Sequence, residues 1–356
     1  MSDKTVVVGM SGGVDSSVAA YLLKKQGYNV IGVTMHVWAN ESDKDSCCGI
    51  TGIEDAKKVA YTLDIPHYVM DFKPEFKANV MDYFVAEYLK GRTPNPCIAC
   101  NRYVKWDALL NKSRAIGADF IATGHYAKII KLENGRYTIA NSVTAAKDQS
   151  YVLYNLTPEQ LKHTLMPVGE YTKDEIRKIA SDIGISVANK PDSQEICFIP
   201  DHDYAGFIEK NVNSIPKEGN YVDVNGNILG KHKGIIHYTV GQRKGLNLSL
   251  GHPAFVVEIR PETNEVVIGT NEDVFSKRLV ADKLNFMAVE DIESATRVKA
   301  KIRYAHKGAD ATIKRIDRER IECIFDEPQR AITPGQAVVF YDDNIVLGGG
   351  TICRNN

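Results

Sequence analysis

The chain has 356 residues, of which 44% are hydrophobic and 25% charged, and its formal net charge is -1. This length predicts two or three domains, and the near-neutral charge excludes nucleic-acid binding through overall charge, so any such surface must be a local patch. No apolar run approaches the length of a membrane span, and the first ten residues are too short and strand-like for a signal peptide, which predicts a cytoplasmic protein.

Strand and helix patterns alternate through the first two thirds of the chain, which predicts a doubly wound parallel sheet. The predicted strands cover residues 5–10, 29–37, 67–72 and 119–129, and the predicted helices cover residues 14–25, 53–63, 74–89, 104–116 and 172–183. Two polar segments, 40–52 and 93–101, are predicted loops, and Asn134-Gly135 predicts a hairpin turn.

After about Tyr204 the long helical patterns disappear. Residues 222–246 and 254–270 predict short strands, and from Leu279 to the end the alternation is sharp; Arg297 to Tyr304 predicts a strand with one basic face. The expected fold class is therefore α/β, with a doubly wound parallel-sheet domain (1–204), a small β-rich middle domain (205–270) and a C-terminal β-barrel (271–356).

The segment Gly9 to Ser16, GMSGGVDS, lies between the first predicted strand and helix. Its glycines let backbone N–H groups approach an anion, and the helix N-terminus adds partial positive charge. Asp15 is informative, because a carboxylate beside phosphates is expected to act as a Mg²⁺ partner. The spacing matches neither a Walker A loop nor a dinucleotide-binding loop, and a glycine turn without a ligand is the remaining alternative.

Seven cysteines, an odd number, are spread unevenly, which in a reducing compartment favours buried, metal-bound or catalytic roles. Cys323 and Cys353 are predicted to fill barrel strands. A zinc site from Cys47, Cys48, Cys97 and Cys100, or an iron–sulfur cluster, has poor ligand spacing, so no stable metal cluster is expected. The other alternative is sulfur transfer, in which one cysteine carries a persulfide and a second attacks or resolves it; Cys100 and Cys197 are the candidates.

The loop resembles the PP-loop of the N-type ATP pyrophosphatases, and the chain as a whole resembles the bacterial tRNA-specific 2-thiouridylases. The matching segments run in order from Lys4 to Ile352: GMSGGVDSSVAAYLL, RTPNPCIACNRYVKW, ATGHYA, KDQSYVL, SQEICFIP, YTVGQRKGL, KIRY and PGQAVVFY. The resemblance implies ATP-dependent 2-thiolation of the wobble uridine in tRNAs for Lys, Glu and Gln, through an adenylated uridine, with AMP and pyrophosphate released.

The resemblance also implies a role for each matching residue. Cys100 would be the nucleophile and Cys197 the persulfide carrier, and a disulfide between them is allowed. ATP, with Mg²⁺, would lie against Gly9, Met10, Ser11, Gly12, Gly13, Val14, Asp15, Ser16, Met35 and Gly124. The target base would meet Asn95, Pro96 and Cys97, and tRNA would contact His125, Lys147, Asp148, Gln149, Arg303, Tyr304 and Gln336.

Two positions depart from the family pattern. Cys97 stands where aspartate is frequent, so its thiol is not expected to be essential, and Trp106 stands where phenylalanine is usual. Cys47 and Cys48 fall in a variable region and receive no role. The family also implies a sulfur donor, either a cysteine desulfurase or a sulfur-relay protein, and the protein is expected to be a monomer.

Two basic clusters are candidates for the tRNA surface. From Arg297 to Arg320 there are nine Lys or Arg and three Asp or Glu. The second cluster, in the middle domain, contains Lys231, His232, Lys233, Arg243 and Lys244. Such clusters contact phosphates and set affinity and register, and the target uridine must flip out of the anticodon stack to reach ATP.

Three other functions remain open on the residues alone. One is a PP-loop ligase that uses a nitrogen nucleophile, another is a non-catalytic tRNA-binding protein that would not need Asp15, and the third is a metalloprotein. Paired Cys100 and Cys197 favour sulfur over nitrogen.

Overall fold

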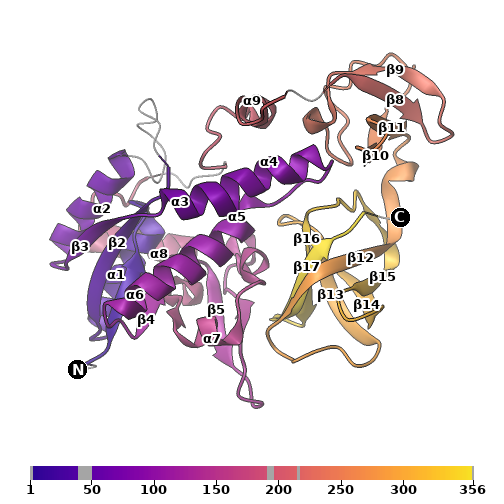
Figure 1. Cartoon of the computed structure of the whole chain (residues 1–356). Coiled ribbons are helices and arrows are strands. Elements are labelled where there is room, and N and C mark those ends of the chain that lie inside the picture. The colour runs from indigo at the N-terminus through magenta and orange to yellow at the C-terminus, as the bar shows by residue number, and fades with distance from the viewer. Residues whose placement is uncertain (1–2, 39–49, 191–195, 215–216, 355–356) are drawn as a thin grey trace.

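The computed structural model describes residues 3–38, 50–190, 196–214 and 217–354 (Figure 1). Five parallel strands form the sheet of the N-terminal domain, which confirms the predicted doubly wound arrangement. Across the sheet the strands are β3 (His67–Asp71), β2 (Asn29–His36), β1 (Thr5–Gly9), β4 (Phe120–Ala122) and β7 (Thr164–Leu165). The chain reverses its direction of winding between β1 and β4, and doubly wound sheets bind ligands at the carboxyl ends of strands at such a point.

Helices bury both faces of this sheet. Val6 and Val8 of β1 belong to the apolar cluster formed with one helix layer, whereas Val7 between them belongs to the cluster on the other face. All three are 0% exposed, as expected when successive side chains of a central strand point to opposite faces. The first layer consists of α1 (Val14–Lys25), α2 (Ile50–Thr62) and α8 (Lys173–Asp182).

Two long helical runs cover the second face. The first confirms the helix predicted near residues 74–89, and the second begins eight residues earlier than predicted. The first run consists of α3 (Lys73–Phe76), η1 (Lys77–Met81) and α4 (Asp82–Leu89), and the second of α5 (Pro96–Ala99), η2 (Cys100–Leu109) and α6 (Leu110–Ala115). Within each run the middle part, η1 or η2, has the wider turns of a π-helix.

The prediction of a loop over residues 93–101 was therefore wrong for its second half. Asn95 is the N-cap of α5, and its side-chain oxygen accepts from the N–H groups of Cys97 (3.0 Å) and Ile98 (3.4 Å). Pro96 takes the first helical position, where a missing N–H is harmless. The same Asn-Pro pair that suggested a loop is thus a helix start.

The strand predicted over residues 119–129 is in fact two strands in different sheets. β4 ends at Ala122, and the chain leaves the parallel sheet at Gly124 before β5 (Ala127–Lys131) begins. A Cβ on Gly124 would lie 2.6 Å from the backbone nitrogen of Ser16, so the chain at this position packs against the start of α1. β5 and β6 (Tyr137–Asn141) form the predicted hairpin, with Gly135 at a φ of 81° in its turn.

The C-terminal domain is a closed six-stranded antiparallel barrel, as predicted. β12 pairs with both β15 and β17, which closes the sheet. Its strands are β12 (Phe275–Phe286), β13 (Thr296–Lys301), β14 (Ala309–Arg315), β15 (Ile321–Arg330), β16 (Ala337–Asp342) and β17 (Ile345–Ile352). The N-terminal domain adds its hairpin to this sheet, because Ala140 of β6 pairs with Ile345 of β17.

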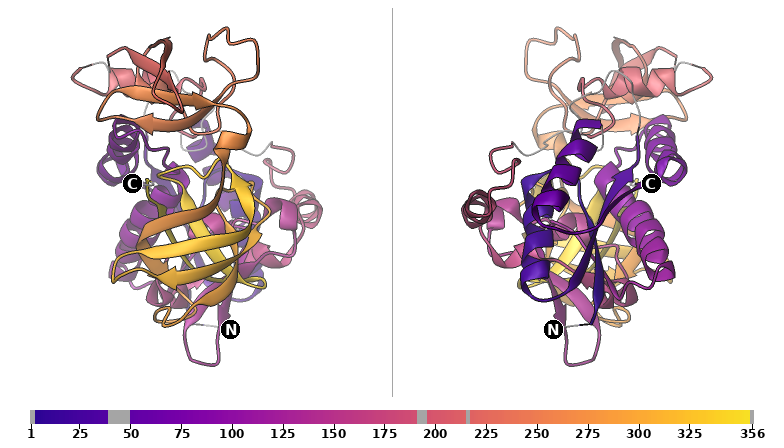
Figure 2. Two further views of the ribbon diagram at one scale, coloured as in Figure 1. Left: turned by 90° about the vertical axis from the view of Figure 1, so that its right-hand side faces the viewer. Right: turned by 90° about the vertical axis from the view of Figure 1, so that its left-hand side faces the viewer.

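The middle domain is a four-stranded sheet at the far end of α4 (Figure 1). Its strands are β8 (Gly219–Asp223), β9 (Ile228–His232), β10 (Phe255–Arg260) and β11 (Glu265–Gly269). In the view that faces the barrel, the sheet of the middle domain lies beyond one end of the barrel (Figure 2).

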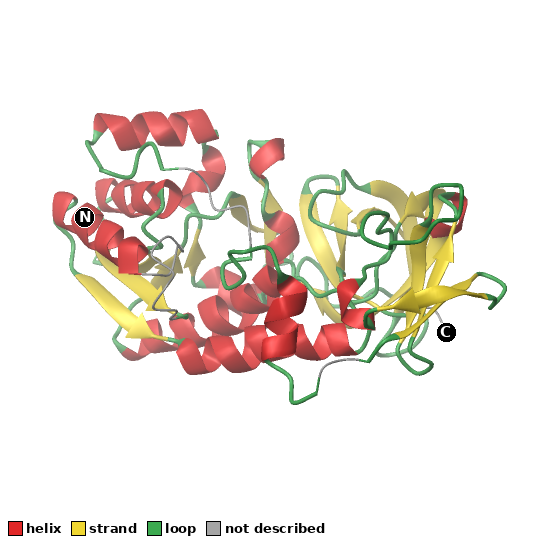
Figure 3. Cartoon of the chain, turned by 90° about the horizontal axis from the view of Figure 1, so that it is seen from above, coloured by secondary structure: helices red, strands yellow, loops and turns green. Residues whose placement is uncertain are grey.

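The remaining short elements of the chain are η3 (Ala145–Lys147), η4 (Ser150–Leu153), α7 (Pro158–Lys162), η5 (Pro167–Glu170), α9 (Tyr204–Lys210), η6 (Ile235–His237) and η7 (Glu272–Val274). Seen from above, the helices gather around the parallel sheet, while strands dominate the other end of the molecule (Figure 3). Among the described residues, no helix is both long enough and apolar enough to span a bilayer.

Candidate active site

The loop from Gly9 to Ser16 joins β1 to α1 in the predicted strand–loop–helix setting. Gly12 has a φ of 71°, and a Cβ there would lie 2.3 Å from the carbonyl oxygen of Gly52, so only glycine fits. Gly13 is the N-cap of the 12-residue helix α1, and as a glycine it has no side chain to cap that end. The first-turn N–H groups are thus available to an anionic ligand, as helix N-termini are at phosphate sites.

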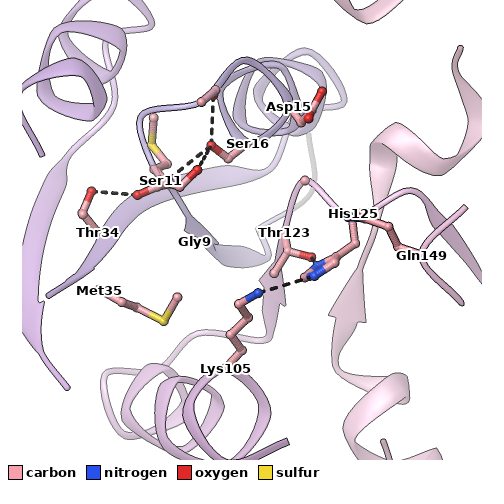
Figure 4. A pocket seen from close by; sticks show the side chains of 13 residues that line it. Gly9, Ser11, Asp15, Ser16, Thr34, Met35, Lys105, Thr123, His125 and Gln149 are labelled. Atoms are coloured by element: carbon pink, nitrogen blue, oxygen red, sulfur yellow. Dashed lines mark hydrogen bonds between the residues drawn. The ribbon is translucent and has the colours of Figure 1, made fainter. Parts of the chain in front are cut away.

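Serine hydroxyls hold this loop in shape. Ser16 Oγ donates to the carbonyl of Gly13 (3.1 Å) and accepts from the N–H of Ser11 (3.2 Å), and Ser17 Oγ donates to the same carbonyl at 2.8 Å. These bonds lie within the loop and the first turn of α1, and those of Ser16 can be followed in Figure 4. The loop is therefore already folded around the space that a phosphate would take.

A cavity of about 200 Å³ opens at the carboxyl ends of β1, β2 and β4. Its walls are Gly9, Met10, Ser11, Gly13, Asp15, Ser16, Thr34, Met35, Lys105, Thr123, Gly124, His125 and Gln149. Of the residues expected to contact ATP, only Gly12 and Val14 do not line it, and Val14 is 3% exposed in the core behind the loop. The glycines, the hydroxyls and the uncapped helix end suit the phosphates of a nucleoside triphosphate, and Met35 supplies an apolar surface suited to its base.

Three of the lining residues escaped the sequence analysis. Thr34 precedes Met35 on β2, Thr123 follows β4, and Lys105 lies in η2 five residues after Cys100. The only sequence signal for Lys105 was its position within the RTPNPCIACNRYVKW segment.

Asp15, expected to hold Mg²⁺, is engaged by a lysine. Nζ of Lys173 lies 2.7 Å from Oδ1 and 2.9 Å from Oδ2 of Asp15, and the hydroxyl of Tyr126 donates to Oδ1 at 2.7 Å. In the described part of the chain, no group of three metal-ligating side chains comes together. The arrangement does not fit a Mg²⁺ ion held by Asp15.

His125 lies inside the cavity. Its Nδ1 is 2.7 Å from Thr123 Oγ1, and its Nε2 is 3.4 Å from Nζ of Lys105. Burial, and secondarily the charge of Lys105, hold the pKa of His125 well below its ordinary value, so the ring is neutral at neutral pH. An ammonium can only donate, so Nε2 accepts from Lys105 and the Nδ1 proton points to Thr123.

Cys100 is half-buried at the junction between α5 and η2, inside a continuous helix. Cys97, one helical turn earlier, is exposed. Wide π-helical turns within longer helices are frequent at functional sites.

Cys197 is also half-buried, and the chain around it is anchored by Phe198. The Phe198 ring is 2% exposed and lies edge-on to Phe76 and Phe84, each at 5.6 Å between centroids. Cys100 and Cys197 both pack against this same apolar cluster, which is the core beneath the two long helical runs. Residues 191–195, immediately before Cys197, lie outside the described residues, as do Cys47 and Cys48.

The other two described cysteines belong to the barrel. Cys323 lies buried on β15, as predicted, whereas Cys353 follows the end of β17 rather than lying in a strand. Burial raises the pKa of Cys323 to about 12 and that of Cys353 to about 11. Such thiols remain protonated near neutral pH and are poor nucleophiles.

Lys147 to Gln149, the three residues after Thr144 that are expected to contact tRNA, differ in their surroundings. Asp148 is 8% exposed, and its carboxylate accepts from the N–H of Ser142 (2.9 Å) and the hydroxyl of Ser150 (2.5 Å). Gln149 Oε1 accepts from the N–H of Tyr126 at 2.9 Å beside the cavity, and Lys147 is half-buried at the end of η3. Asp148 and Gln149 are thus engaged in holding the loop.

The barrel brings the remaining expected tRNA residues close to this segment. The ring of Tyr304 lies edge-on to that of Tyr151 at 6.2 Å, and Gln336 Nε2 donates to the carbonyl of Thr93 at 2.8 Å. Arg303 and Tyr304 lie in a turn, because β13 ends at Lys301 rather than continuing to Tyr304 as predicted. Residues distant in sequence thus surround the start of α5.

The basic face of the barrel is less positive than its sequence suggested. Arg297 pairs with Asp326 (2.7 Å), Lys299 with Asp310 (3.0 Å), Arg315 with Asp291 (2.5 Å) and Arg320 with Asp317 (2.7 Å). Two of these carboxylates lie outside the window from Arg297 to Arg320, and strand pairing brings Asp326 beside the window. A charge count within one segment therefore overestimated the local excess.

The basic cluster of the middle domain also loses a member. His232 is 2% exposed, and its Nε2 is 3.1 Å from the carbonyl oxygen of Asn264. Burial is the main cause that lowers its pKa, so it packs as a neutral ring against Tyr221 and Tyr238. The remaining members are lysines and an arginine.

Three family models match the chain in succession. They are the tRNA methyl transferase HUP domain over residues 4–201, the tRNA methyl transferase PRC-barrel domain over residues 205–270 and the aminomethyltransferase beta-barrel domain over residues 276–352.

Proteins similar to the chain along its full length carry one name. A tRNA-specific 2-thiouridylase MnmA from Lachnoclostridium phytofermentans is 66% identical over 356 residues, covering 99% of this chain and 100% of that protein. Its namesake from Clostridioides difficile is 55% identical, covering 98% of each chain. A solved structure, the U34-tRNA thiolase NcsA from Methanococcus maripaludis with its 4Fe-4S cluster, is 20% identical with a TM-score of 0.36, covering 59% of this chain and 67% of that one. The full-length relatives extend over all three domains rather than over the N-terminal domain alone.

Proposed function

The chain belongs to the tRNA-specific 2-thiouridylase family, and from this membership we propose that it catalyses the ATP-dependent 2-thiolation of the wobble uridine in tRNAs for Lys, Glu and Gln. One observation carries the proposal: the helix that begins at α5 holds Cys100 and, one turn later, extends Lys105 into the cavity beside the phosphate loop. Nucleotide chemistry and sulfur chemistry therefore have neighbouring positions on one rigid element.

In the proposed reaction, O2 of the flipped-out uridine attacks the α-phosphorus of ATP, and pyrophosphate leaves along the Ser11–Gly13 side of the loop. The uncapped first turn of α1 and the loop N–H groups stabilise the negative charge that leaves. Mg²⁺ enters the proposal as a partner of the ATP phosphates, because both oxygens of Asp15 are engaged by Lys173.

The sulfur-transfer step then balances in atoms and electrons with a persulfide on Cys197 and the thiolate of Cys100. The terminal sulfur of a Cys197 persulfide attacks C2, and AMP departs with the former O2 oxygen. The Cys100 thiolate attacks the inner sulfur of Cys197, which breaks the S–S bond to the transferred sulfur and leaves 2-thiouridine and a Cys100–Cys197 disulfide. A cellular thiol reduces this disulfide, and a cysteine desulfurase or a sulfur-relay protein reloads Cys197.

Cys100 and Cys197 both pack against the core beneath the two long helical runs, and the raised pKa values of Cys323 and Cys353 argue against those two as alternatives. Asn95, Pro96 and Cys97, at the start of α5 where the Cys97 side chain is exposed, are the proposed contacts of the target base. The proposed contacts of the anticodon arm are Lys147, Gln149, Arg303, Tyr304 and Gln336. Asp148 holds the loop that carries Lys147 and Gln149. We also propose that the protein acts in the cytoplasm and as a monomer.

The test combines purified protein, an unmodified tRNA transcript, ATP, Mg²⁺ and a persulfide source, with mass spectrometry of the nucleosides. Wild type is expected to yield 2-thiouridine, AMP and pyrophosphate, and Cys100→Ser and Cys197→Ser are expected to yield no thiolated product. Cys353→Ser, a half-buried barrel cysteine, is the matched control and should retain thiolation.

Each alternative has its own outcome in this assay. Full thiolation by Cys100→Ser would refute the cysteine assignment. Pyrophosphate release with a nitrogen-containing product would identify a PP-loop ligase, and tRNA binding without pyrophosphate release would identify a non-catalytic binding protein.

A further inference from the structure

Lys105 is directed into the nucleotide cavity from the wall opposite the phosphate loop. Its side chain rises from the helix toward His125, with Met35 to one side and Ser11 and Ser16 across the space (Figure 4). It lies five residues after Cys100, about one π-helical turn, so the same helical run carries the cavity-lining lysine and the proposed nucleophile.

Two uncharged groups hold this ammonium in place. Asn101 is 1% exposed; its Nδ2 donates to the carbonyl of Val152 at 2.8 Å, and its Oδ1 accepts from Lys105 Nζ at 2.9 Å. The neutral His125 ring accepts from the same Nζ at 3.4 Å and is itself oriented by Thr123. An ammonium has three N–H donors, so these contacts leave one for a ligand in the cavity.

Lys105 differs in its ion pairing from the other lysines beside the loop. Lys173 pairs with Asp15, and Lys190 pairs with Asp55 at 2.8 Å while also donating to the carbonyl of Gly12. Within the described ranges of the chain, no carboxylate forms an ion pair with Lys105, although its side chain is half-buried. A fixed, partly desolvated cation without a protein counter-charge is suited to an anionic ligand.

Position identifies which part of the nucleotide this cation meets. The uncapped start of α1 and the loop face the leaving pyrophosphate, and Cys100 marks the side from which the acceptor base arrives. The group between leaving pyrophosphate and arriving base is the α-phosphoryl group.

We propose that Lys105 is a further catalytic residue, whose ammonium contacts a non-bridging oxygen of the α-phosphoryl group as the uridine O2–phosphorus bond forms and the bond to pyrophosphate breaks. This inference rests on the proposed function. Lys105 donates hydrogen bonds and exchanges no proton, so the step needs no further reactant. Asn101 and His125 are positioning residues that orient it.

The test compares Lys105→Met, Lys105→Arg and the control Lys162→Met, whose lysine is exposed on α7. In single-turnover assays with saturating tRNA, Lys105→Met is expected to slow AMP formation by about 100- to 1000-fold, the usual cost of removing one preorganised charge-stabilising donor. The dissociation constant for ATP should change by less than about threefold, because the contact strengthens in the transition state. Lys105→Arg should recover part of the rate, and Lys162→Met should match wild type.

Two further readouts separate catalysis from folding. Persulfide loading of Cys197, followed by intact-protein mass spectrometry, and the thermal unfolding midpoint should be unchanged in Lys105→Met. AMP formation at the wild-type rate in Lys105→Met would overturn the inference, and so would a loss confined to ATP affinity or accompanied by unfolding. If wild type itself released no pyrophosphate with tRNA, the proposed function would fail instead.

Discussion

The ammonium of Lys173, the first residue of α8, lies 2.7 Å from Oδ1 of Asp15 in the first turn of α1. Only 10% of the Lys173 side chain and 27% of the Asp15 side chain are exposed. Tyr126, which follows the turn after β4, donates to the same carboxylate oxygen. The phosphate-loop aspartate thus ties together α1, α8 and the segment between β4 and β5 at the wall of the cavity.

Replacing Lys173 with methionine tests the structural weight of this ion pair. Removal of the ammonium leaves a largely buried carboxylate with a single strong donor, so the free energy of unfolding in urea should fall by about 1–3 kcal/mol. The control Lys77→Met breaks an exposed pair with Asp82 and should cost at most about 0.5 kcal/mol. Equal losses in the two variants would show that the buried pair contributes nothing special.

Magnesium dependence provides a second test of Asp15. Because its oxygens are occupied by Lys173, Asp15→Asn should lower activity through loop geometry while the Mg²⁺ concentration for half-maximal pyrophosphate release shifts by less than about twofold. A Mg²⁺ titration of tRNA-dependent pyrophosphate release measures this. A tenfold or larger rise in the required Mg²⁺ would restore Asp15 as a metal ligand.

Gly124 is expected to tolerate no side chain. A Cβ there would lie 2.6 Å from the nitrogen of Ser16 and 2.7 Å from the carbonyl carbon of Asp15, both rigid backbone atoms. Gly124→Ala should lower stability by about 1–3 kcal/mol and weaken ATP binding, as measured by chemical denaturation and calorimetry. Gly9→Ala is the comparison, because its nearest contact would be an ordinary 3.7 Å, and its stability should stay close to wild type. Similar destabilisation in both would contradict the argument.

The cysteines should differ in reactivity toward iodoacetamide. Burial raises the pKa of Cys323 to about 12, so at pH 8 its thiolate fraction is negligible, and reactivity would appear only as the pH approaches that value. Exposed Cys97 should be alkylated first in the native protein, and Cys323 only after unfolding. Peptide mass spectrometry of a time course at pH 8 decides the order, and early labelling of Cys323 would count against its burial in the barrel.

Ion pairing on the barrel predicts which arginine contributes to tRNA affinity. Arg297 is neutralised by Asp326, whereas Arg303 donates to the backbone carbonyl of Arg330 from the turn that carries Tyr304. Arg303→Ala should weaken tRNA binding several-fold and reduce the slope of log affinity against log salt by about 1, as loss of one phosphate contact does. Arg297→Ala should leave both nearly unchanged. Filter binding at several salt concentrations measures this, and a reversed ranking would refute it.

Much of the local structure was predictable from short-range patterns. Residues 5–10, 29–37 and 74–89 folded as expected, because apolar periodicity and glycine stops act over a few residues. The Asn95-Pro96 pair led to a wrong loop prediction, because the same dipeptide occurs in turns and at helix starts. Here it starts a helix, because the Asn95 side chain caps α5. The strand predicted across Gly124 failed because its ending depends on contact with a helix more than a hundred residues earlier.

For the site, the sequence by itself determined the phosphate loop, Met35, Gly124 and the two cysteine candidates, since these depend on residue chemistry within motifs and on family resemblance. The tertiary structure alone decided the rest. Lys173 meets Asp15 across 158 residues, Asp326 neutralises Arg297 from another strand, and Lys105 reaches the cavity only because its helix packs beneath β1 and β4. Charges act through space, so their partners, and hence their roles, are settled by which elements pack together and not by their order along the chain.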